Sequence, residues 1–559
     1  MKALLIMIIL FFALVAGLYS AVMWLSDIPF NSWFDFGFIE IMNDVTHGRL
    51  FIKNGLFAIG SLAAFVLITT FLFWEPKSRN RFGDARFATN NELRKYGYFT
   101  NKGLILGQTR FLGRLIMSYG PKTIGLSAPP RSGKTVSMVI PNLLNWEGSM
   151  IAVDVKKELF QITSGQRAAM GDKIIVFDPL SPDKQSHCIN VFDDVSRDPD
   201  FTISDIDKLV ENFIPADDKF WDAGAQNIFK AIALYLIETN QHISLGSIYR
   251  FANDGTNLQD KFLAIIDQEE NLSEECLAKL SSYGNEESEK ISGGFYAGFN
   301  LAMQDYANPL LAAATDKSDF DFTKLRTENT SIYLVVRPEH LQILGAVFGT
   351  VIETLAFVLT RHEPEKDEKG KVLFMCDEFT ALGNLKRVKQ GAAFFGGYGV
   401  RLVMIYQNDA QLKSIYNQHG SDELIGLMHE RVVFAPSSNE EATKISRELG
   451  DMTIKTTNRS YSQGRVSRSV SESPKALMSA RKLLEMPNKN ELILATEQKP
   501  IKCKKIFYYK DKRFKSRLLP SYAQKVPRLI VKKYKFKEIE ITKDDLTQSG
   551  NLADMVSEF

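Results

Sequence analysis

The sequence has few of the side chains that build disulfide frameworks and zinc sites. Its 559 residues include 4 cysteines and 7 histidines. Cys188, Cys276, Cys376 and Cys503 lack the spacing of metal clusters, so neither a zinc site nor a disulfide framework is indicated. No repeat of fixed period is present. The composition indicates an intracellular protein rather than a secreted one, and the length allows a membrane anchor with two or three further domains.

A net charge of either sign is almost absent from the chain as a whole, which carries +2. This balance conceals a strong division. Residues 193–321 contain 25 Asp and Glu against 9 Lys and Arg, a balance of −16, so the remainder carries about +18. Within this stretch IFKAIALYLIE and LQDKFLAIID have apolar residues at helical spacing. We expect an acidic all-α domain over residues 191–321, inserted between the strands IIVFDPL and SIYLVV.

One segment has the pattern of a phosphate-binding loop. TIGLSA (123–128) is typical of a strand, and the overlapping APPRSGKT (128–135) is typical of a loop that opens a helix. Such a loop surrounds phosphate with backbone N–H groups, while Lys134 reaches the β/γ oxygens and Thr135 binds Mg²⁺. A small residue, Ala128, replaces the usual first glycine. The candidate nucleotide-binding residues are Ala128, Arg131, Ser132, Gly133, Lys134 and Thr135.

A second motif supports the first, whose pattern is loose. Five apolar residues, VLFMC, predict a parallel strand buried on both faces, and Asp377 and Glu378 follow at its carboxyl end. By the division of labour in P-loop hydrolases, we assign Asp377 to the Mg²⁺ shell and Glu378 to polarising the attacking water. Asp-Glu at a strand end is common, so the assignment depends on the phosphate loop.

A third buried strand, GVRLVMIYQ (399–407), ends in Gln407. This amide is a candidate to bind the γ-phosphate or its water; an ordinary loop hydrogen bond is the alternative. Arg387 and Arg401 are candidates for an arginine finger acting on a neighbouring subunit, with a solvated surface arginine as the alternative for each.

Three charged residues follow the strand MIAV: Asp154, Lys156 and Glu158. If that strand neighbours the strand before the phosphate loop, they lie beside the nucleotide.

The order of these motifs resembles a known family. GDARFAT (83–89), SAPPRSGKT, IAVDVKKEL, IIVFDPL, FMCDEFTALG, GYGVRLVMIYQNDAQL and VVFAPSSNEEATKISRELG together resemble the TraG/TraD-type coupling proteins of type IV secretion and conjugation, from about residue 80 to about 515. The resemblance implies a RecA-like ATPase that uses ATP and Mg²⁺, assembles as a hexamer at the inner membrane and passes substrates to the secretion channel. It also implies that the all-α domain chooses substrates. Pro130 stands where the family loop usually has threonine, in its variable middle.

Two apolar segments at the N-terminus predict a membrane anchor over residues 1–80. Residues 3–25 and 55–74 lack charge and are each long enough to cross ~30 Å of hydrocarbon. Basic residues follow the second span and acids dominate the loop 26–54, so by the positive-inside rule the loop is periplasmic and the bulk of the chain cytoplasmic, at a bacterial inner membrane. A signal peptide is the alternative for the first segment, and a buried core hairpin is the alternative for the pair.

The partners follow from the charge division. An acidic domain repels nucleic acid and attracts basic peptides, such as signals on an effector or a DNA-linked relaxase; a merely solvated acidic surface is the alternative. Residues 502–537 have 14 basic residues against one acid, interleaved with aromatics. This mixture suits single-stranded nucleic acid or anionic membrane lipid. IKCKKIFYYKD is expected to be a motor strand, so binding is expected only after Lys512, with residues 516–559 as a C-terminal tail.

Residues 456–473, TTNRSYSQGRVSRSVSES, are nearly devoid of apolar side chains. Such a stretch cannot bury enough surface to order itself, so a mobile loop is expected, at a subunit boundary or the central pore.

We therefore predict an α/β fold: a RecA-like P-loop motor over residues 81–190 and 322–515, the inserted all-α domain and a two-helix transmembrane anchor. The predicted function is an ATPase that recruits protein or relaxase–DNA substrates and delivers them to the channel. Two alternatives remain. The first is an FtsK-like DNA translocase, although such pumps usually have four spans and a long linker. The second is a nucleotide-binding receptor with little turnover, which would tolerate loss of Glu378.

Overall fold

The fold is known from a computed structural model that describes residues 81–539 except 216–217, 366–369 and 463–464. The chain divides into two compact units, Met1–Phe82 and Gly83–Phe559, so nearly all of the described residues belong to the second. The predicted spans 3–25 and 55–74 lie outside the described residues.

An eleven-stranded sheet forms the centre of the second unit, in the order β2-β1-β13-β12-β9-β3-β8-β7-β4-β6-β5. From β9 to β5 all neighbouring strands are parallel, and from β12 to β2 the pairs are antiparallel. The bounds are β1 Leu104–Gln108, β2 Leu115–Ser118, β3 Ile124–Ser127, β4 Met150–Val155, β5 Lys173–Phe177, β6 Thr330–Val336, β7 Val372–Asp377, β8 Val400–Tyr406, β9 Glu430–Val433, β12 Asn490–Ala495 and β13 Ile501–Lys504.

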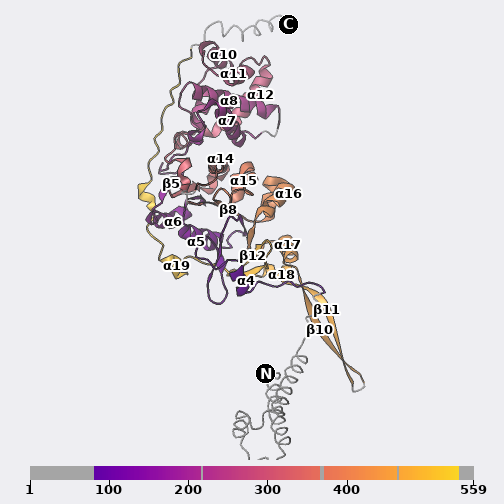
Figure 1. The fold of residues 1–559 in the computed structure, drawn as a ribbon. Coiled ribbons are helices and arrows are strands. Elements are labelled where there is room, and N and C mark those ends of the chain that lie inside the picture. The colour runs from indigo at the N-terminus through magenta and orange to yellow at the C-terminus, as the bar shows by residue number, and fades with distance from the viewer. Residues whose placement is uncertain (1–80, 216–217, 366–369, 463–464, 540–559) are drawn as a thin grey trace, which may run out of the picture. The chain divides into compact units, whose positions relative to one another are not determined.

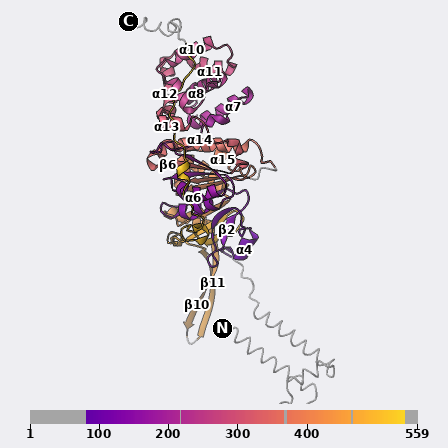
Figure 2. The same ribbon diagram turned by 90° about the vertical axis from the view of Figure 1, so that its left-hand side faces the viewer.

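The parallel strands are buried on both faces, as their apolar runs predict. In β4, Ile151 and Val153 join one hydrophobic core, while Met150 and Ala152 join the other. The second core contains α5 Ile140–Asn145 and α6 Glu158–Ala169; the first contains α14 Leu341–Thr360. Alternation of side chains along a strand produces this division. The α/β class expected for the motor is thereby confirmed, with helices on both faces of the sheet (Figures 1 and 2).

The described residues between β5 and β6 form helices and loops, and Gln185 makes an isolated bridge to Arg528. Polar residues cap the helices, among them Asp198, Ser244, Asn257 and Ser273, whose side chains accept the first free N–H groups. The main helices are α7 Pro199–Phe213, α8 Trp221–Glu238, α9 Leu245–Ala252, α10 Leu258–Gln268, α11 Glu274–Gly284, α12 Glu289–Met303 and α13 Pro309–Ala314, with short turns η3 Val191–Asp194, η4 Gln304–Ala307 and η5 Phe322–Arg326. Their apolar side chains join the same core as α14, so this helical insertion shares its core with the motor.

Helix α14 is apolar along most of its length. The segment Pro338–Thr360 is, among the described residues, the one helix long and apolar enough to cross a membrane. Its most apolar window is 78% buried inside the protein. It therefore serves as the core helix between the sheet and the helical insertion, beside η6 Pro338–His340.

The prediction of a mobile loop over residues 456–473 is wrong in its secondary structure. The chain forms an antiparallel ribbon, β10 Asp451–Ser462 and β11 Arg465–Ala476, paired from Asp451↔Ala476 to Ser462↔Arg465. Both views show it projecting from the sheet (Figures 1 and 2). Backbone pairing forms a ribbon without a buried core, and composition alone missed this because it weighs side chains only.

Short elements complete the motor: α4 Asn90–Lys95, α15 Lys386–Gly391, α16 Asp409–Leu427, α17 Asn439–Leu449, α18 Ala480–Leu484, α19 Lys512–Lys515 and η7 Phe379–Leu382. The described part of the tail, residues 516–539, contains η8 Tyr522–Lys525 and is not free. We call it the C-terminal strap. Its Tyr522 N–H donates to Ser164 Oγ on α6, and its Leu529 N–H donates to the Lys184 carbonyl at 2.8 Å.

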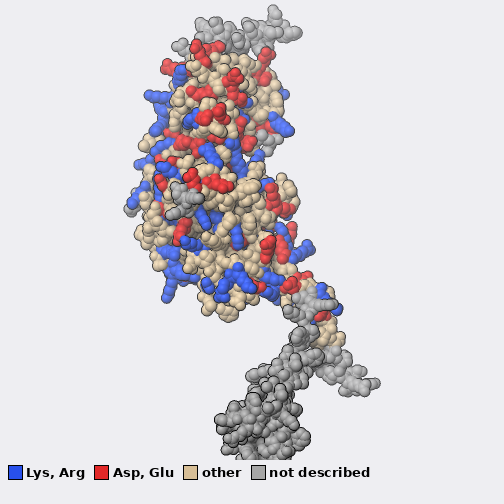
Figure 3. All heavy atoms as spheres, viewed as in Figure 1, with Lys and Arg blue, Asp and Glu red and all other residues tan. Residues whose placement is uncertain are grey.

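Charge follows this architecture. Figure 3 shows acidic side chains gathered over the helical insertion, and lysine and arginine gathered at the opposite end of the motor. The charge division seen in the sequence is therefore also a division in space.

Candidate nucleotide site

The phosphate-loop segment lies where strand order brings the predicted residues together. β3 ends at Ser127, β8 at Tyr406 and β7 at Asp377, and these strands are neighbours with Ser127 opposite Tyr406. Because parallel strands end at the same edge, the residues after them converge. The chain turns through residues 128–134 and enters η2 Thr135–Val139, a π-helical turn that continues into α5. Such turns are frequent at functional sites.

The loop needs glycine for its backbone. Gly133 has φ +88°, a left-handed conformation, whereas an added Cβ would meet only ordinary contacts. Arg131 adopts φ 61° nearby, and Ala128 is fully buried with its N–H donating to the Tyr406 carbonyl at 3.0 Å. A small residue is thus what this buried position accepts.

Four side chains meet at the strand ends. Lys134 Nζ lies 2.5 Å from Glu378 Oε2 and 3.3 Å from Asp377 Oδ1. Thr135 Oγ1 donates to Asp377 Oδ2 at 2.9 Å. The carboxylates of Asp377 and Glu378 raise the pKa of Lys134, although burial alone would lower it, whereas burial raises the pKa of Asp377. The lysine is therefore held as a cation between two carboxylates.

Gln407 completes this group, because β8 lies between β3 and β7. Its Nε2 donates to Glu378 Oε1 at 2.9 Å, and its backbone N–H donates to Gln411 Oε1 at 3.1 Å. Glu378 itself has φ 105° and ψ 56°, an uncommon conformation for a residue with a side chain. Strained backbone of this kind concentrates at functional sites.

The residues present fit a nucleotide with Mg²⁺. Asp377 Oδ1 and Ser132 Oγ are buried and make no hydrogen bond. Within the described part of the chain, no group of three or more His, Cys, Asp or Glu could hold a metal by itself. A single carboxylate beside a threonine hydroxyl is the hard-oxygen set that Mg²⁺ takes when phosphates supply further ligands.

Asp154 has a different role from the one considered in the sequence. Its carboxylate is fully buried and accepts the N–H groups of Leu159 at 3.1 Å and Phe160 at 2.8 Å, which begin α6. Burial raises its pKa to about 7. Lys156 has φ 98° and donates its N–H to the Val336 carbonyl, and Glu158 lies in the first turn of α6. These contacts make Asp154 a support for the start of α6.

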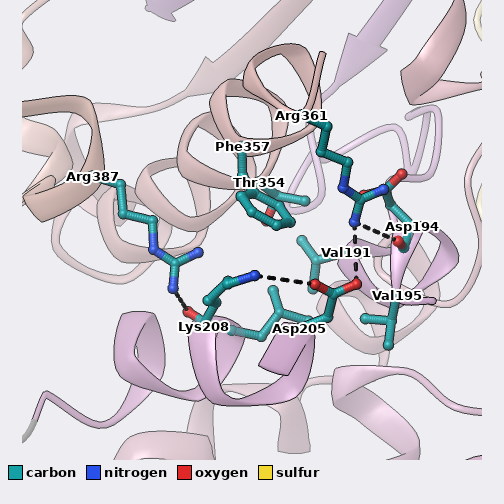
Figure 4. A pocket seen from close by; sticks show the side chains of 10 residues that line it. Val191, Asp194, Val195, Asp205, Lys208, Thr354, Phe357, Arg361 and Arg387 are labelled. Carbon is teal, nitrogen blue, oxygen red and sulfur yellow. Dashed lines mark hydrogen bonds and ion pairs between the residues drawn. The ribbon is translucent and has the colours of Figure 1, made fainter. Parts of the chain in front are cut away.

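The alternative of a solvated surface arginine is wrong for Arg401, and Arg387 is only partly exposed. Arg401 is buried, and donates to the Lys122 carbonyl and to Ser118 Oγ at 3.1 Å each. Arg387 donates to the Lys208 carbonyl of α7, as Figure 4 shows. Each guanidinium is thus engaged within its own chain, and the sequence could not identify Arg401 as buried.

Sequence reasoning also missed Lys505, which follows β13. Its Nζ donates to the Ser132 carbonyl of the loop at 2.9 Å and to Asn488 Oδ1 at 3.1 Å, and it lies 3.3 Å from the centroid of the Phe434 ring. Burial lowers its pKa to about 8. The only signal was a lysine at the end of a strand, 373 residues from Ser132.

A parallel sheet whose adjacent strand ends bring a phosphate-loop lysine to an Asp-Glu pair and a glutamine defines the P-loop class of α/β proteins. The family comparison is more specific. Residues 85–529 match the model of the family described as type IV secretory system conjugative DNA transfer. The chain belongs to this family, and the resemblance drawn from its motifs is confirmed.

Individual relatives agree. The chain is 32% identical to protein VirD4 of Agrobacterium fabrum over 479 residues, covering 82% of this chain and 70% of that protein. It is 27% identical to the conjugal transfer protein TraG of Escherichia coli, covering 66% and 62%. Among solved structures, plasmid coupling protein TrwB in complex with the ATP analogue ADPNP aligns with a TM-score of 0.59 at 12% identity, covering 81% and 98%. This last likeness concerns the fold.

Proposed function

We propose that this chain is the ATP-hydrolysing coupling protein of a type IV secretion or conjugation system, which recruits substrates and delivers them to the channel. One observation carries the hydrolytic part: Glu378 lies between Lys134 and Gln407 at the strand ends. Membership of the conjugative DNA transfer family supports the transfer part. TrwB, which shares the fold, binds an ATP analogue in one structure and ADP with Mg²⁺ in another.

Each residue has a distinct task. Lys134 exchanges its carboxylate partners for the β/γ-phosphates, where a cation offsets developing negative charge. Thr135 and Asp377 would hold Mg²⁺, which would supply positive charge to offset that of the phosphates. The backbone N–H groups of the loop and of the helix start are the further donors to phosphate. Release of Lys134 frees the Glu378 carboxylate to accept a proton from the attacking water.

Gln407 gives the site a means of reporting nucleotide state. Its amide contacts Glu378 on one side, and its backbone leads directly into α16. Once Glu378 turns to water and phosphate, that hydrogen bond exchanges partners. A change at the γ-phosphate therefore alters the anchoring of α16.

The setting of the motor belongs to the same proposal. We infer a homo-hexamer at a bacterial inner membrane, anchored by spans at residues 3–25 and 55–74, with residues 81–190 and 322–515 as the motor and 191–321 as the substrate-selecting domain. The N-terminal apolar runs and the family membership support it. Its clients are effector proteins or relaxase–DNA complexes.

Turnover by the purified full chain tests the hydrolytic part. Glu378→Gln keeps the side-chain volume and one of the two acceptor oxygens but removes the base, so we expect turnover to fall at least ~100-fold while binding of an ATP analogue stays within ~3-fold. Glu328→Gln, at an exposed acid, is the matched control and should retain full turnover. An unchanged rate for Glu378→Gln would refute the assignment. A wild-type chain that binds nucleotide without turnover would favour the receptor alternative.

A further inference from the structure

The C-terminal strap ends on the helical insertion in an extended conformation. Over residues 532–537, KKYKFK, the side chains alternate: Tyr534 and Phe536 are half-buried, whereas Lys533 and Lys535 are exposed. An extended segment presents every second side chain to one face. Both aromatic residues therefore face the helices and the intervening lysines face solvent.

The Tyr534 side chain packs closely against the start of α9 and against α13. Its ring stacks on His242 at a centroid distance of 6.2 Å, and its hydroxyl lies 3.4 Å from the Ala312 carbonyl on α13 and 3.5 Å from Ser244 Oγ at the start of α9. A Cβ added to Gly246 would come within 2.4 Å of that hydroxyl. The absence of a side chain at Gly246 is what lets the tyrosine approach.

Phe536 and Lys537 extend the contact. The Phe536 ring meets Phe251 of α9 edge-on at 5.3 Å. Lys537 Nζ pairs with Glu269 at 2.5 Å, and its backbone N–H donates to Gln241 Oε1 at 2.9 Å. Two aromatic contacts and one ion pair thus fix three residues of the strap: Tyr534, Phe536 and Lys537.

The preceding residues do not fill the surface they cross. A cleft of about 460 Å³ lies between the strap and helices α9 and α13, lined among others by Asp254, Asp316 and Tyr534. Ile530 is 73% exposed over it, and Val531 is 54% exposed. A strap selected only to hold the two domains together would bury such apolar side chains, because each is worth roughly 1.5 to 3 kcal/mol when buried.

A tethered segment needs little intrinsic affinity, because the tether gives it an effective concentration of roughly millimolar. The groove, however, has side-chain specificity, and it lies on a domain that carries a charge balance of −16. Acidic side chains attract lysine-rich peptide and repel phosphate backbones. These features describe a peptide receptor holding a weak occupant of its own chain.

We propose that the groove formed by α9, α13 and Glu269 at the end of α10 receives lysine-rich, extended segments with aromatic residues at alternate positions on proteins to be transferred, and that residues 532–537 occupy it until such a segment displaces them. This inference rests on the proposed function, since it identifies the groove as the substrate surface of the coupling protein.

Peptide binding to the full chain in detergent tests it, with no nucleotide present. The probe is a fluorescent peptide of residues 530–538, followed by anisotropy. The chain carrying Tyr534→Ala and Phe536→Ala should bind this probe at least ~10-fold more tightly than the wild-type chain, because the tethered competitor is lost. A probe with alanine at both aromatic positions, equal in charge, should bind neither chain measurably.

A second comparison changes the groove and uses two acid-to-lysine variants, one inside the groove and one outside it. In the double-alanine background Glu269→Lys should weaken probe binding at least ~5-fold, whereas Glu287→Lys, at an exposed acid outside the groove, should leave it within ~2-fold. If the double variant does not fold, Lys537→Glu breaks the pair with Glu269 and serves the same comparison.

Equal affinity of wild-type and double-variant chains would overturn the inference, and so would equal binding of the alanine probe. Displacement of the probe by single-stranded DNA would assign the groove to nucleic acid and also overturn it. Loss of peptide binding leaves nucleotide turnover untouched, while failure of Glu378→Gln to slow turnover leaves the groove untouched, so the two proposals fail separately.

Discussion

The nucleotide site and the interface between motor and helical insertion both place carboxylates against cations, but these charges are satisfied differently. At the interface, Arg361 Nη2 pairs with Asp194 at 2.9 Å and Asp205 at 3.2 Å, and its guanidinium lies 4.8 Å from the Phe357 ring (Figure 4). At the nucleotide site, Asp377 Oδ1 makes no hydrogen bond and Glu378 has a strained backbone.

This difference separates two uses of ion pairs. At the interface the pairs hold two parts of the chain together, whereas the carboxylates at the nucleotide site share the loop lysine that phosphate would take, beside a residue with strained backbone. The regions are also joined: Glu378 begins η7, and nine residues later Arg387 donates to the Lys208 carbonyl of the helical insertion. Nucleotide state and helical insertion therefore share one short segment of chain.

The largest expected effect is loss of ligand binding at the nucleotide site. Lys134→Ala removes the cation that binds phosphate and should weaken ATP-analogue binding by about 3 kcal/mol, or ~100-fold. The melting temperature of the wild-type chain should rise with analogue and Mg²⁺, and that of the variant should not. A rise of equal size in the variant would remove Lys134 from the site.

A substitution at the interface between motor and helical insertion should lower stability and leave nucleotide binding intact. Arg361→Ala leaves the carboxylates of Asp194 and Asp205 without their shared cation, and should lower the free energy of unfolding by about 2 kcal/mol. The rise in melting temperature that nucleotide causes should persist on top of the lower baseline. Arg481→Ala, at an arginine that is 86% exposed, is the control and should change neither quantity. Loss of nucleotide binding in Arg361→Ala would show that the two regions are not separable.

The pH dependence of stability sharpens the same comparison. Burial raises the pKa of Asp194 to about 6, even though Arg361 opposes the shift. The folded chain therefore binds a proton more readily than the unfolded chain, whose aspartates titrate near 3.9. This group's contribution to stability grows as pH falls from about 7 to about 4, and is lost as pH rises through 6.

We therefore compare the free energy of unfolding of Asp194→Asn with that of the wild-type chain by urea unfolding at pH 7.5 and at pH 4.5. The difference, variant minus wild type, should be about 1 kcal/mol larger at pH 7.5 than at pH 4.5. Asp200→Asn, at an exposed aspartate, supplies the control. A difference between variant and wild type that does not change with pH would mean that Asp194 remains ionised throughout.

The sequence was sufficient for the parts that depend on local pattern. Lys134, Thr135, Asp377 and Gln407 were placed correctly at one sheet edge, because buried apolar runs identify parallel strands and parallel strands end together. It failed where burial depends on distant chain. Arg401 lies in a strand whose neighbours were unknown, and nothing near it in sequence shows that it donates to Ser118.

The predictions for the ribbon β10–β11 and for the C-terminal strap were incomplete for other reasons. Residues 456–473 lack a core, but serine, threonine and valine in alternation suit paired strands, and this β-propensity was the available signal. The basic strap carries a composition that suits nucleic acid, lipid or an acidic protein surface. Only the docked structure, with Tyr534 and Phe536 on the helical insertion, distinguishes among them.

The smallest expected effect concerns Lys505, which contacts the nucleotide site through a backbone carbonyl of the phosphate loop. Its hydrogen bond to the Ser132 carbonyl is worth about 1 kcal/mol, so Lys505→Met, which keeps most of the side-chain volume, should raise the KM for ATP ~5-fold and leave kcat within ~2-fold. Lys504→Met, at the neighbouring residue, should change neither constant. Because Lys505 contacts the loop carbonyl and not the carboxylates of Asp377 and Glu378, it orders the loop for binding without entering the chemical step. A fall in kcat equal to the fall in kcat/KM would instead place Lys505 among the groups that stabilise the transition state.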